Sequence, residues 1–157
     1  LKHSGQDYTI LEFSPYGYDE RQYCSPGFNL AVGNFSRTPH GRYPQYHTSA
    51  DDLTLVQPTY LADSLAKILA VVKVLEGNGT YRNTNPKCEP QLGKRGLYAA
   101  LGGRKDSSLS EIAMLWVLNY SDGAHSLLDI AEKADISFDV IRRVASVLAE
   151  HNLLAPV

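Results

Sequence analysis

The sequence predicts an α/β segment followed by a mainly α-helical segment. Two stretches rich in β-branched and aromatic residues, 8–13 and 28–33, precede a long amphipathic pattern at 58–76. The charge changes along the chain: residues 1–105 carry 12 Lys and Arg against 9 Asp and Glu, whereas residues 106–157 carry 3 against 8. We therefore expect two domains, residues 1–80 and 106–157, joined by a linker at 81–105.

The first part holds two expected strands and one long helix. The stretch 8–13 stops at a Ser-Pro pair, and a polar, aromatic loop without a helical period separates it from the second strand. Loops at the ends of core strands are where α/β proteins place their chemistry. Pro58 suits the first turn of a helix, and the Gly-Asn-Gly that starts at Gly77 ends it. Apolar residues occupy more than one side of this helix, so we expect it to be covered.

The last fifty residues predict three helices and a strand. An apolar helix is expected at 109–120, a short helix begins after Ser126 as N-cap, and Ser137 caps a third that runs to His151. Residues 152–157 suit a final strand. Helix, short helix, tight turn, helix and strand are the order of a winged helix-turn-helix.

Composition excludes several classes of protein. No stretch approaches the ~18 apolar residues of a membrane span, and the N-terminus has no apolar signal core. Two cysteines, Cys24 and Cys88, are too few for a disulfide framework and lack metal-ligand spacing. These features favour a reducing, cytoplasmic location, and the start at Leu1 suggests a trimmed or incomplete reading frame.

One pair of motifs points to chemistry. Residues 46–53 read YHTSADDL and follow FSPYGYDERQYCSPG at 13–27. Together these motifs resemble bacterial aminopeptidase-like proteins, which are grouped with the zinc aminopeptidases and glutaminyl cyclases and often lie near polysaccharide-biosynthesis genes. The resemblance covers essentially the whole chain, but the chain corresponds only to the C-terminal portion of a typical member. It implies the end of a three-layer zinc-aminopeptidase-like domain followed by a winged helix.

The resemblance also implies site residues. The family's zinc-binding His falls on His47, and the acidic position of the motif falls on Asp51. Asp51 could orient the metal ligand by a hydrogen bond without binding the metal itself. The alternative is that Asp51 or Asp52 caps a local turn. Asp19 lies where relatives carry an Asp followed by His, although here Glu follows. Arg21 could hold a substrate carboxylate, or could be a structural ion-pair partner.

Aromatic residues accompany this motif. Tyr46 precedes the candidate ligand, and four more tyrosines lie in the two loops. They could wall a substrate pocket, or they could pack the long loops. The set comprises Tyr16, Tyr18, Tyr23, Tyr43 and Tyr46.

The rest of a zinc peptidase is missing from the sequence. The family needs an acidic ligand in an Asp-Asn-x-Ser-Gly stretch and a Glu that activates the metal-bound water, and residues 1–157 contain no such stretch. In the parent reaction zinc polarises a carbonyl, and the water it shares with that Glu attacks. Zinc would bind here only if residues outside the chain complete the site. The chain is either a natural remnant or a fragment, and alone it should be inactive.

Other residues suggest three further kinds of site. Cys24 could be a nucleophile with His47 as its base, but their proximity cannot be read from sequence. Glycine-rich turns at 93–96 and 102–105 lack the Lys-Ser/Thr of a phosphate loop. Nucleic-acid binding by the third helix is disfavoured because residues 106–157 have a net charge of −5. The only basic residues of that helix are Arg142 and Arg143. Binding would need help from the basic linker at 94–105, so a protein partner suits the acidic winged helix better.

Two functions remain. One is a component of a zinc aminopeptidase-like hydrolase; the other is a non-catalytic interaction module built on the winged helix. In either case the incomplete α/β part should expose strand edges and apolar surface. We therefore expect a homo-oligomer, with the helix at 58–76 buried at the contact.

Overall fold

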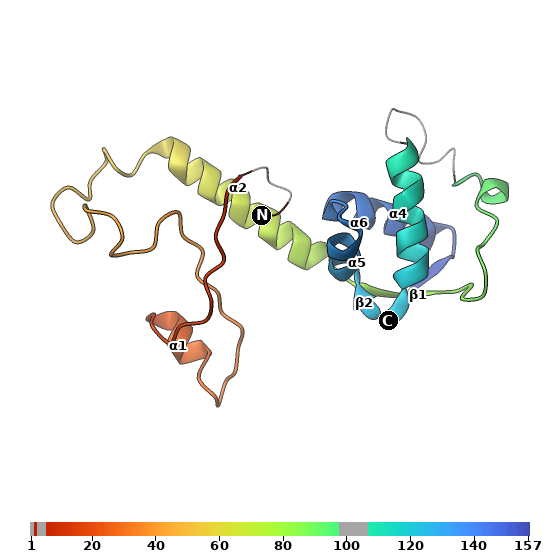
Figure 1. The fold of residues 1–157 in the computed structure, drawn as a ribbon, viewed down its shortest axis with the longest axis horizontal. Coiled ribbons are helices and arrows are strands. Elements are labelled where there is room, and N and C mark those ends of the chain that lie inside the picture. Colours follow the sequence, from red (N-terminus) through yellow and green to blue (C-terminus); the bar gives the residue numbers. More distant parts are fainter. Residues whose placement is uncertain (1, 3–5, 98–106) are drawn as a thin grey trace. The chain divides into compact units, whose positions relative to one another are not determined.

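The computed structural model describes residues 2, 6–97 and 107–157 (Figure 1). The chain divides into two compact units, Leu1–Ile68 and Leu69–Val157, and each is described by itself. Among the described residues, no helix is long and apolar enough to cross a membrane.

The first unit contains no strand among its described residues. The strands expected at 8–13 and 28–33 are absent, because a strand is defined by hydrogen-bonded pairing with a neighbouring strand, and neither stretch is paired in this way in the described structure. The loop expected to lack helix contains a short one, α1, at Asp19–Tyr23. The backbone N–H of Cys24 closes it by donating to Glu20 O at 2.8 Å.

The long helix α2 spans Pro58–Gly77, as the sequence predicts. Pro58 lies in its first turn, where a missing N–H has no consequence. None of its residues is buried, although its apolar pattern predicts a covered helix. The helix is shared between the units, since the division falls after Ile68.

A three-stranded antiparallel sheet forms in the second unit. Its order is β2-β1-β3, with β1 at Thr80–Asn83, β2 at Asp122–Ser126 and β3 at Leu154–Pro156. The sequence predicts the final strand but not β2, and β1 runs from the end of the expected first domain into the expected linker. That segment also contains the 3₁₀ turn η1, Gly93–Arg95, while its residues 98–105, including the turn at 102–105, lie outside the described part.

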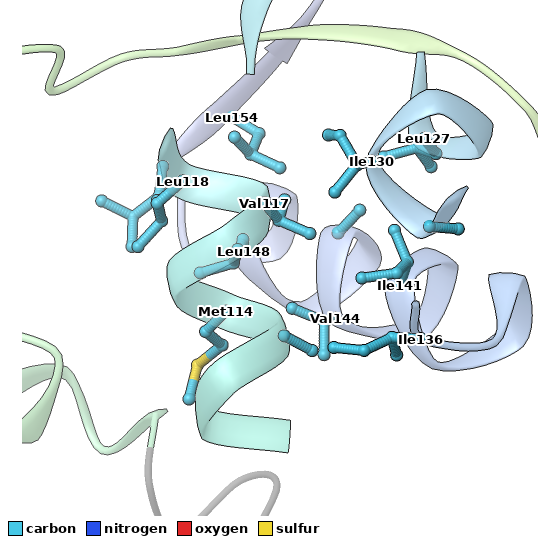
Figure 2. Close-up of a cluster of buried hydrophobic side chains, with 14 of the residues drawn as sticks. Met114, Val117, Leu118, Leu127, Ile130, Ile136, Ile141, Val144, Leu148 and Leu154 are labelled. Atoms are coloured by element: carbon cyan, nitrogen blue, oxygen red, sulfur yellow. The ribbon is translucent and has the colours of Figure 1, made fainter. Parts of the chain in front are cut away.

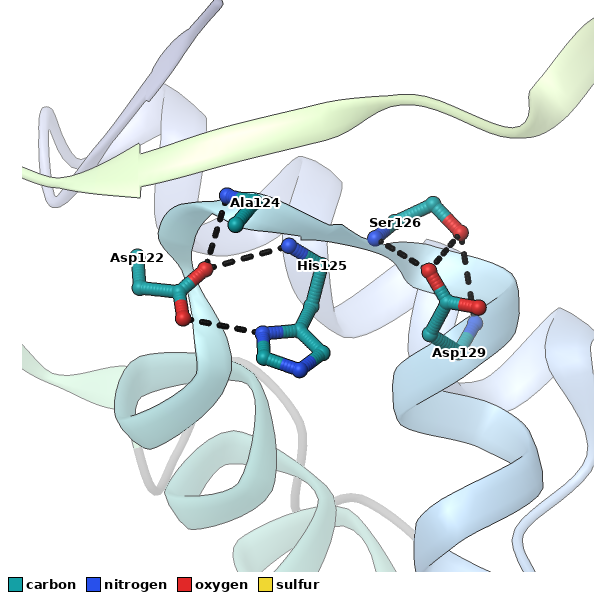
Figure 3. Close-up of polar contacts among 5 residues, drawn as sticks. All are labelled: Asp122, Ala124, His125, Ser126 and Asp129. Carbon is teal, nitrogen blue, oxygen red and sulfur yellow. Dashed lines mark hydrogen bonds and ion pairs between the residues drawn. The ribbon is translucent and has the colours of Figure 1, made fainter.

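The three expected helices are present. They are α4 at Ser107–Tyr120, α5 at Leu127–Ala134 and α6 at Phe138–Glu150. Ser126 caps α5: its Oγ accepts from Asp129 N at 3.3 Å while the Asp129 carboxylate accepts from Ser126 N at 2.8 Å (Figure 3). Ser137 occupies the N-cap position of α6 but makes no side-chain cap hydrogen bond.

One hydrophobic core lies between α4, α5, α6 and the sheet (Figure 2). The side chains of Met114, Val117, Ile141 and Leu148 are wholly buried there. Leu92 and Leu97 also belong to it, so the segment expected to be a linker supplies core residues. The buried hydrophobic side chains are Leu92, Leu97, Ala113, Met114, Val117, Leu118, Leu127, Ile130, Ala131, Ile136, Phe138, Ile141, Val144, Ala145, Leu148, Leu153 and Leu154.

Candidate functional site

His47 lies at an exposed turn in the first unit. Its φ is +57°, a left-handed conformation that few non-glycine residues adopt. Hydrogen bonds on both sides fix the turn: Thr48 N donates to Gln45 O at 3.1 Å, and Asp51 N donates to Thr48 O at 3.2 Å. The local backbone therefore holds the imidazole at a defined place on the surface.

The imidazole belongs to a ring cluster made of Tyr16, His40, Tyr43, Tyr46 and His47. The His47 ring stacks on Tyr46 with centroids 4.0 Å apart and planes 16° apart. Tyr46 also meets Tyr43 edge-on at 5.6 Å and His40 at 5.9 Å, and His40 lies 6.1 Å from Tyr16. Burial, with the nearby Tyr18, Tyr16 and Tyr43, raises the pKa of Tyr46. Half-buried Tyr46 is thus the centre of the cluster.

The other expected site residues make contacts of their own in the described structure. Asp19 is the first residue of α1, and the Arg21 guanidinium lies over the Tyr18 ring, 5.6 Å from its centroid. Within the described residues, neither of them nor the Asp51 side chain forms a hydrogen bond or ion pair with His47. Of the expected site residues, Tyr46 is thus the one that contacts His47 in the described structure.

Two carboxylates have structural partners instead. Asp52 Oδ1 accepts from Thr54 N at 2.8 Å and from Thr54 Oγ1 at 2.7 Å, and these bonds lower the pKa of Asp52. Asp52 is thus the residue that caps the local turn. Glu20, which the sequence analysis gave no role, accepts from Asn34 Nδ2 at 2.7 Å, and this bond is the main cause of its lowered pKa. Only its position beside Asp19 could have drawn attention to it.

The described residues do not make a metal site by themselves. No group of three or more His, Cys, Asp or Glu side chains that could hold a metal lies among them. A catalytic zinc takes three protein ligands and keeps one position for water. The donor set here fits one ligand, His47, whose ring is exposed and held by its stack on Tyr46.

Cys24 is engaged elsewhere. Its Sγ lies 3.8 Å from Val32 O, to which the thiol donates a weak hydrogen bond. Since that contact is with the backbone eight residues on, the structure gives no support to the Cys24–His47 nucleophile pair.

In the second unit, α2 covers part of the helix that reads DNA in many winged helices. Lys73 Nζ forms an ion pair with Asp139 at 2.9 Å. A Cβ placed on Gly77 would lie 2.7 Å from Arg142 Cδ, so the Arg142 stem runs directly over the end of α2. Arg142 Nε is buried without a hydrogen-bond partner in the described structure. Arg142 is therefore packed against protein, which leaves Arg143 as the exposed cation of α6.

The sheet also differs from that of a DNA-binding winged helix, where a hairpin after the third helix forms the wing. Here β3 pairs with β1, a strand that precedes all three helices. Tyr81 lies opposite Pro156 and Asn83 opposite Leu154. Within the described residues, the strand that follows α6 is thus paired with a strand from before the helices.

Three helices, this sheet and the order of the elements define a winged helix-turn-helix, and residues 79–156 match the family model with that description. Residues 1–78 match a second family model, described as "Domain of unknown function (DUF4910)".

The chain has a relative in Clostridium acetobutylicum, named "Putative polysaccharide biosynthesis protein with aminopeptidase-like domain", to which it is 50% identical over 154 residues. The match covers 98% of this chain and 35% of the relative. A crystal structure of a "putative peptidase" from the same organism matches 100% of this chain and 34% of its own, with 47% identity and a TM-score of 0.87. The resemblance to aminopeptidase-like proteins is confirmed, for a chain that spans about a third of the length of these relatives.

Proposed function

We propose that this chain is the C-terminal part of a zinc-dependent aminopeptidase-like hydrolase and contributes His47 as one zinc ligand. The observation that carries the proposal is the exposed imidazole of His47, held at a hydrogen-bonded turn and stacked on Tyr46, in a motif that resembles one of this class of protein. The other ligands and the water-activating Glu would come from polypeptide outside these residues. Bound zinc would polarise the scissile carbonyl.

The residues of this chain have the task of presenting the ligand. The turn at 45–51 fixes the backbone, and the Tyr46 ring restricts the rotation of the imidazole. A ligand held in advance loses less conformational entropy when the metal binds. With one ligand out of three, the chain alone should be inactive.

Zinc content tests this proposal. The experiment uses a chimera, in which this chain replaces the matching third of the Clostridium acetobutylicum relative in one continuous polypeptide. We expect stoichiometric zinc by elemental analysis, and release of the N-terminal residue from aminoacyl p-nitroanilides. His47→Ala should lose both, while His40→Ala, which alters the same ring cluster, should keep the zinc. Retention of zinc by His47→Ala would refute the role of His47.

A second function, a non-catalytic interaction module, is favoured by a different observation. The winged helix has its Arg142 packed against α2 and a net charge of −5 over residues 106–157. Such a surface repels phosphates and suits contacts with protein. A chimera that contains no zinc and keeps its fold after His47→Ala would support this alternative.

A further inference from the structure

Exposed apolar side chains are concentrated in the first half of the chain. Of the 26 large hydrophobic side chains that are exposed in the described residues, 21 lie before residue 78. Among the described residues up to Ile68, only Gly17 is buried. An apolar surface of this extent, without a core beneath it, normally marks an interface.

Part of this surface has the sequence of β-strands but no strand partners. In the stretch 8–13, Ile10 is 80% exposed and Phe13 is 77% exposed. In the stretch 28–33, Phe28 is 72% exposed. β-Branched and aromatic residues favour strands where a neighbouring strand and a packed face are present, so these stretches have the composition of strands that lack their sheet.

The helix α2 supplies the remainder of the surface. Its apolar side chains stand at helical spacings, and Leu61, Leu65 and Leu75 are 59%, 56% and 69% exposed. A helix that is apolar on more than one side is typical of the interior of a larger domain.

The lengths of the relatives point to one occupant for the surface. The crystal structure reproduces the fold of this whole chain at a TM-score of 0.87 within a polypeptide of which it forms 34%. A segment without a core of its own therefore keeps this conformation in a polypeptide whose other two thirds are available to pack on it. A second copy of this chain is a poorer occupant, because it would add the same unpaired stretches and no zinc ligand other than its own His47.

We propose that the two stretches 8–13 and 28–33, together with the part of α2 up to Ile68, form a docking surface for the remainder of an aminopeptidase-like polypeptide. The two stretches pair with strands of that polypeptide's sheet, and the part of α2 up to Ile68 packs against a face of the sheet. The inference rests on the proposed function in one respect, that the chain is part of such a hydrolase. It does not depend on zinc or on His47.

Co-expression tests the docking surface. The chain is produced as a separate polypeptide together with the part of the Clostridium acetobutylicum relative that it does not match. We expect a 1:1 complex by analytical ultracentrifugation, and amide exchange at 8–13 and 28–33 that slows by at least ~100-fold relative to the chain alone. Absence of a 1:1 complex, or exchange that stays fast in both stretches, would overturn the proposal.

Matched variants locate the contact. Ile10→Asp should abolish the complex, whereas Ile112→Asp, at an exposed position on α4, should leave it intact. Thermal unfolding followed by Trp116 fluorescence checks that the second unit is still folded in both variants. Equal loss with both variants, or a homodimer that persists beside the remainder, would contradict the assignment.

The outcomes for docking and for catalysis separate cleanly. A complex that also forms with His47→Ala, beside a single-chain chimera without zinc, would uphold the docking surface and refute the zinc site at His47. A chimera with His47-dependent zinc, without any complex in trans, would do the reverse.

Discussion

At the scale of single residues, short polar side chains decide where the elements of the winged helix begin. Ser126 and Asp129 satisfy each other's backbone N–H groups at the start of α5. Just before them, Asp122 Oδ1 accepts from Ala124 N at 2.8 Å and from His125 N at 3.1 Å, while Oδ2 meets His125 Nδ1 at 2.8 Å (Figure 3). These hydrogen bonds thus order β2 and the first turn of α5, which follows it directly.

The two candidate caps make a first prediction. Ser126→Ala should lower the free energy of unfolding by about 1 kcal/mol, because it removes a cap hydrogen bond. Ser137→Ala should change it by no more than a few tenths, since Ser137 makes no such bond. Urea unfolding followed by Trp116 fluorescence measures both, and equal effects would show that the capping box contributes nothing.

Asp122 makes a second prediction, about pH. Hydrogen bonds from the backbone of Ala124 and His125 lower the pKa of Asp122 from 3.8 to about 2. A lowered pKa stabilises the fold above the unfolded value, so this stability should be present above pH ~4 and be lost as the pH falls toward ~2.

The variant Asp122→Asn isolates that effect, because the amide oxygen can still accept the two backbone hydrogen bonds. The urea midpoint of wild type should fall between pH ~4 and ~2 more steeply than that of the variant. Parallel curves would assign the acid sensitivity to other carboxylates with lowered pKa values, such as Asp129 and Asp63.

At the scale of elements, local signals were predictable and pairing was not. The limits of α2, α4, α5 and α6 follow from apolar periodicity, Pro58 and Ser126, all of which are local. The strand β2, DGAHS, carries no β-branched residue and forms because β1 lies beside it. Conversely, 8–13 has the composition of a strand without a partner.

Of the candidate site, the turn of His47 was predictable, but the ring contacts around Tyr46 depend on loop geometry that no periodicity encodes.

Burial separates two isoleucines of identical chemistry. Ile141 on α6 is fully buried, while Ile112 on α4 is 51% exposed. Ile141→Ala should cost about 2–5 kcal/mol through lost burial and a cavity, and Ile112→Ala less than about 0.5 kcal/mol. Urea unfolding of the two variants compares them directly, and similar losses would contradict the core described for the second unit.

The packing of α6 predicts weak affinity for DNA. Arg142 lies over Gly77, and Asp139 is paired with Lys73, so Arg143 is the exposed one of the two basic residues of α6. Fluorescence anisotropy with a labelled duplex should show no binding at about 150 mM salt, and Arg143→Ala should change nothing. Salt-dependent binding that weakens in Arg143→Ala would instead establish a nucleic-acid interface.

At the scale of the whole molecule, one half has a core and the other does not. Full burial of a large apolar side chain is worth roughly 1.5–3 kcal/mol. The 21 exposed side chains before residue 78 therefore represent a large stabilisation that the isolated chain leaves unused. The second unit, with seventeen buried hydrophobic residues, has the core expected of an independent domain.

This asymmetry predicts self-association of the chain when it is alone. Oligomers should form through α2, and the double variant Leu65→Glu, Leu69→Glu should shift the population toward monomer. Leu128→Glu, at an exposed position on α5, is the matched control. Sedimentation velocity over a concentration series measures the distribution. A wild-type chain that stays monomeric throughout would refute the expectation.

The position of β1 at the centre of the sheet has a consequence for synthesis on the ribosome. Its neighbours, residues 122–126 and 154–156, are translated long after residues 80–83. At about 5–20 residues per second, the middle strand waits roughly 4–15 s for the second of them. Throughout that interval β1 has unpaired backbone groups and lies directly after α2, whose apolar side chains are exposed. Chaperone capture of the nascent chain should be strongest in this window.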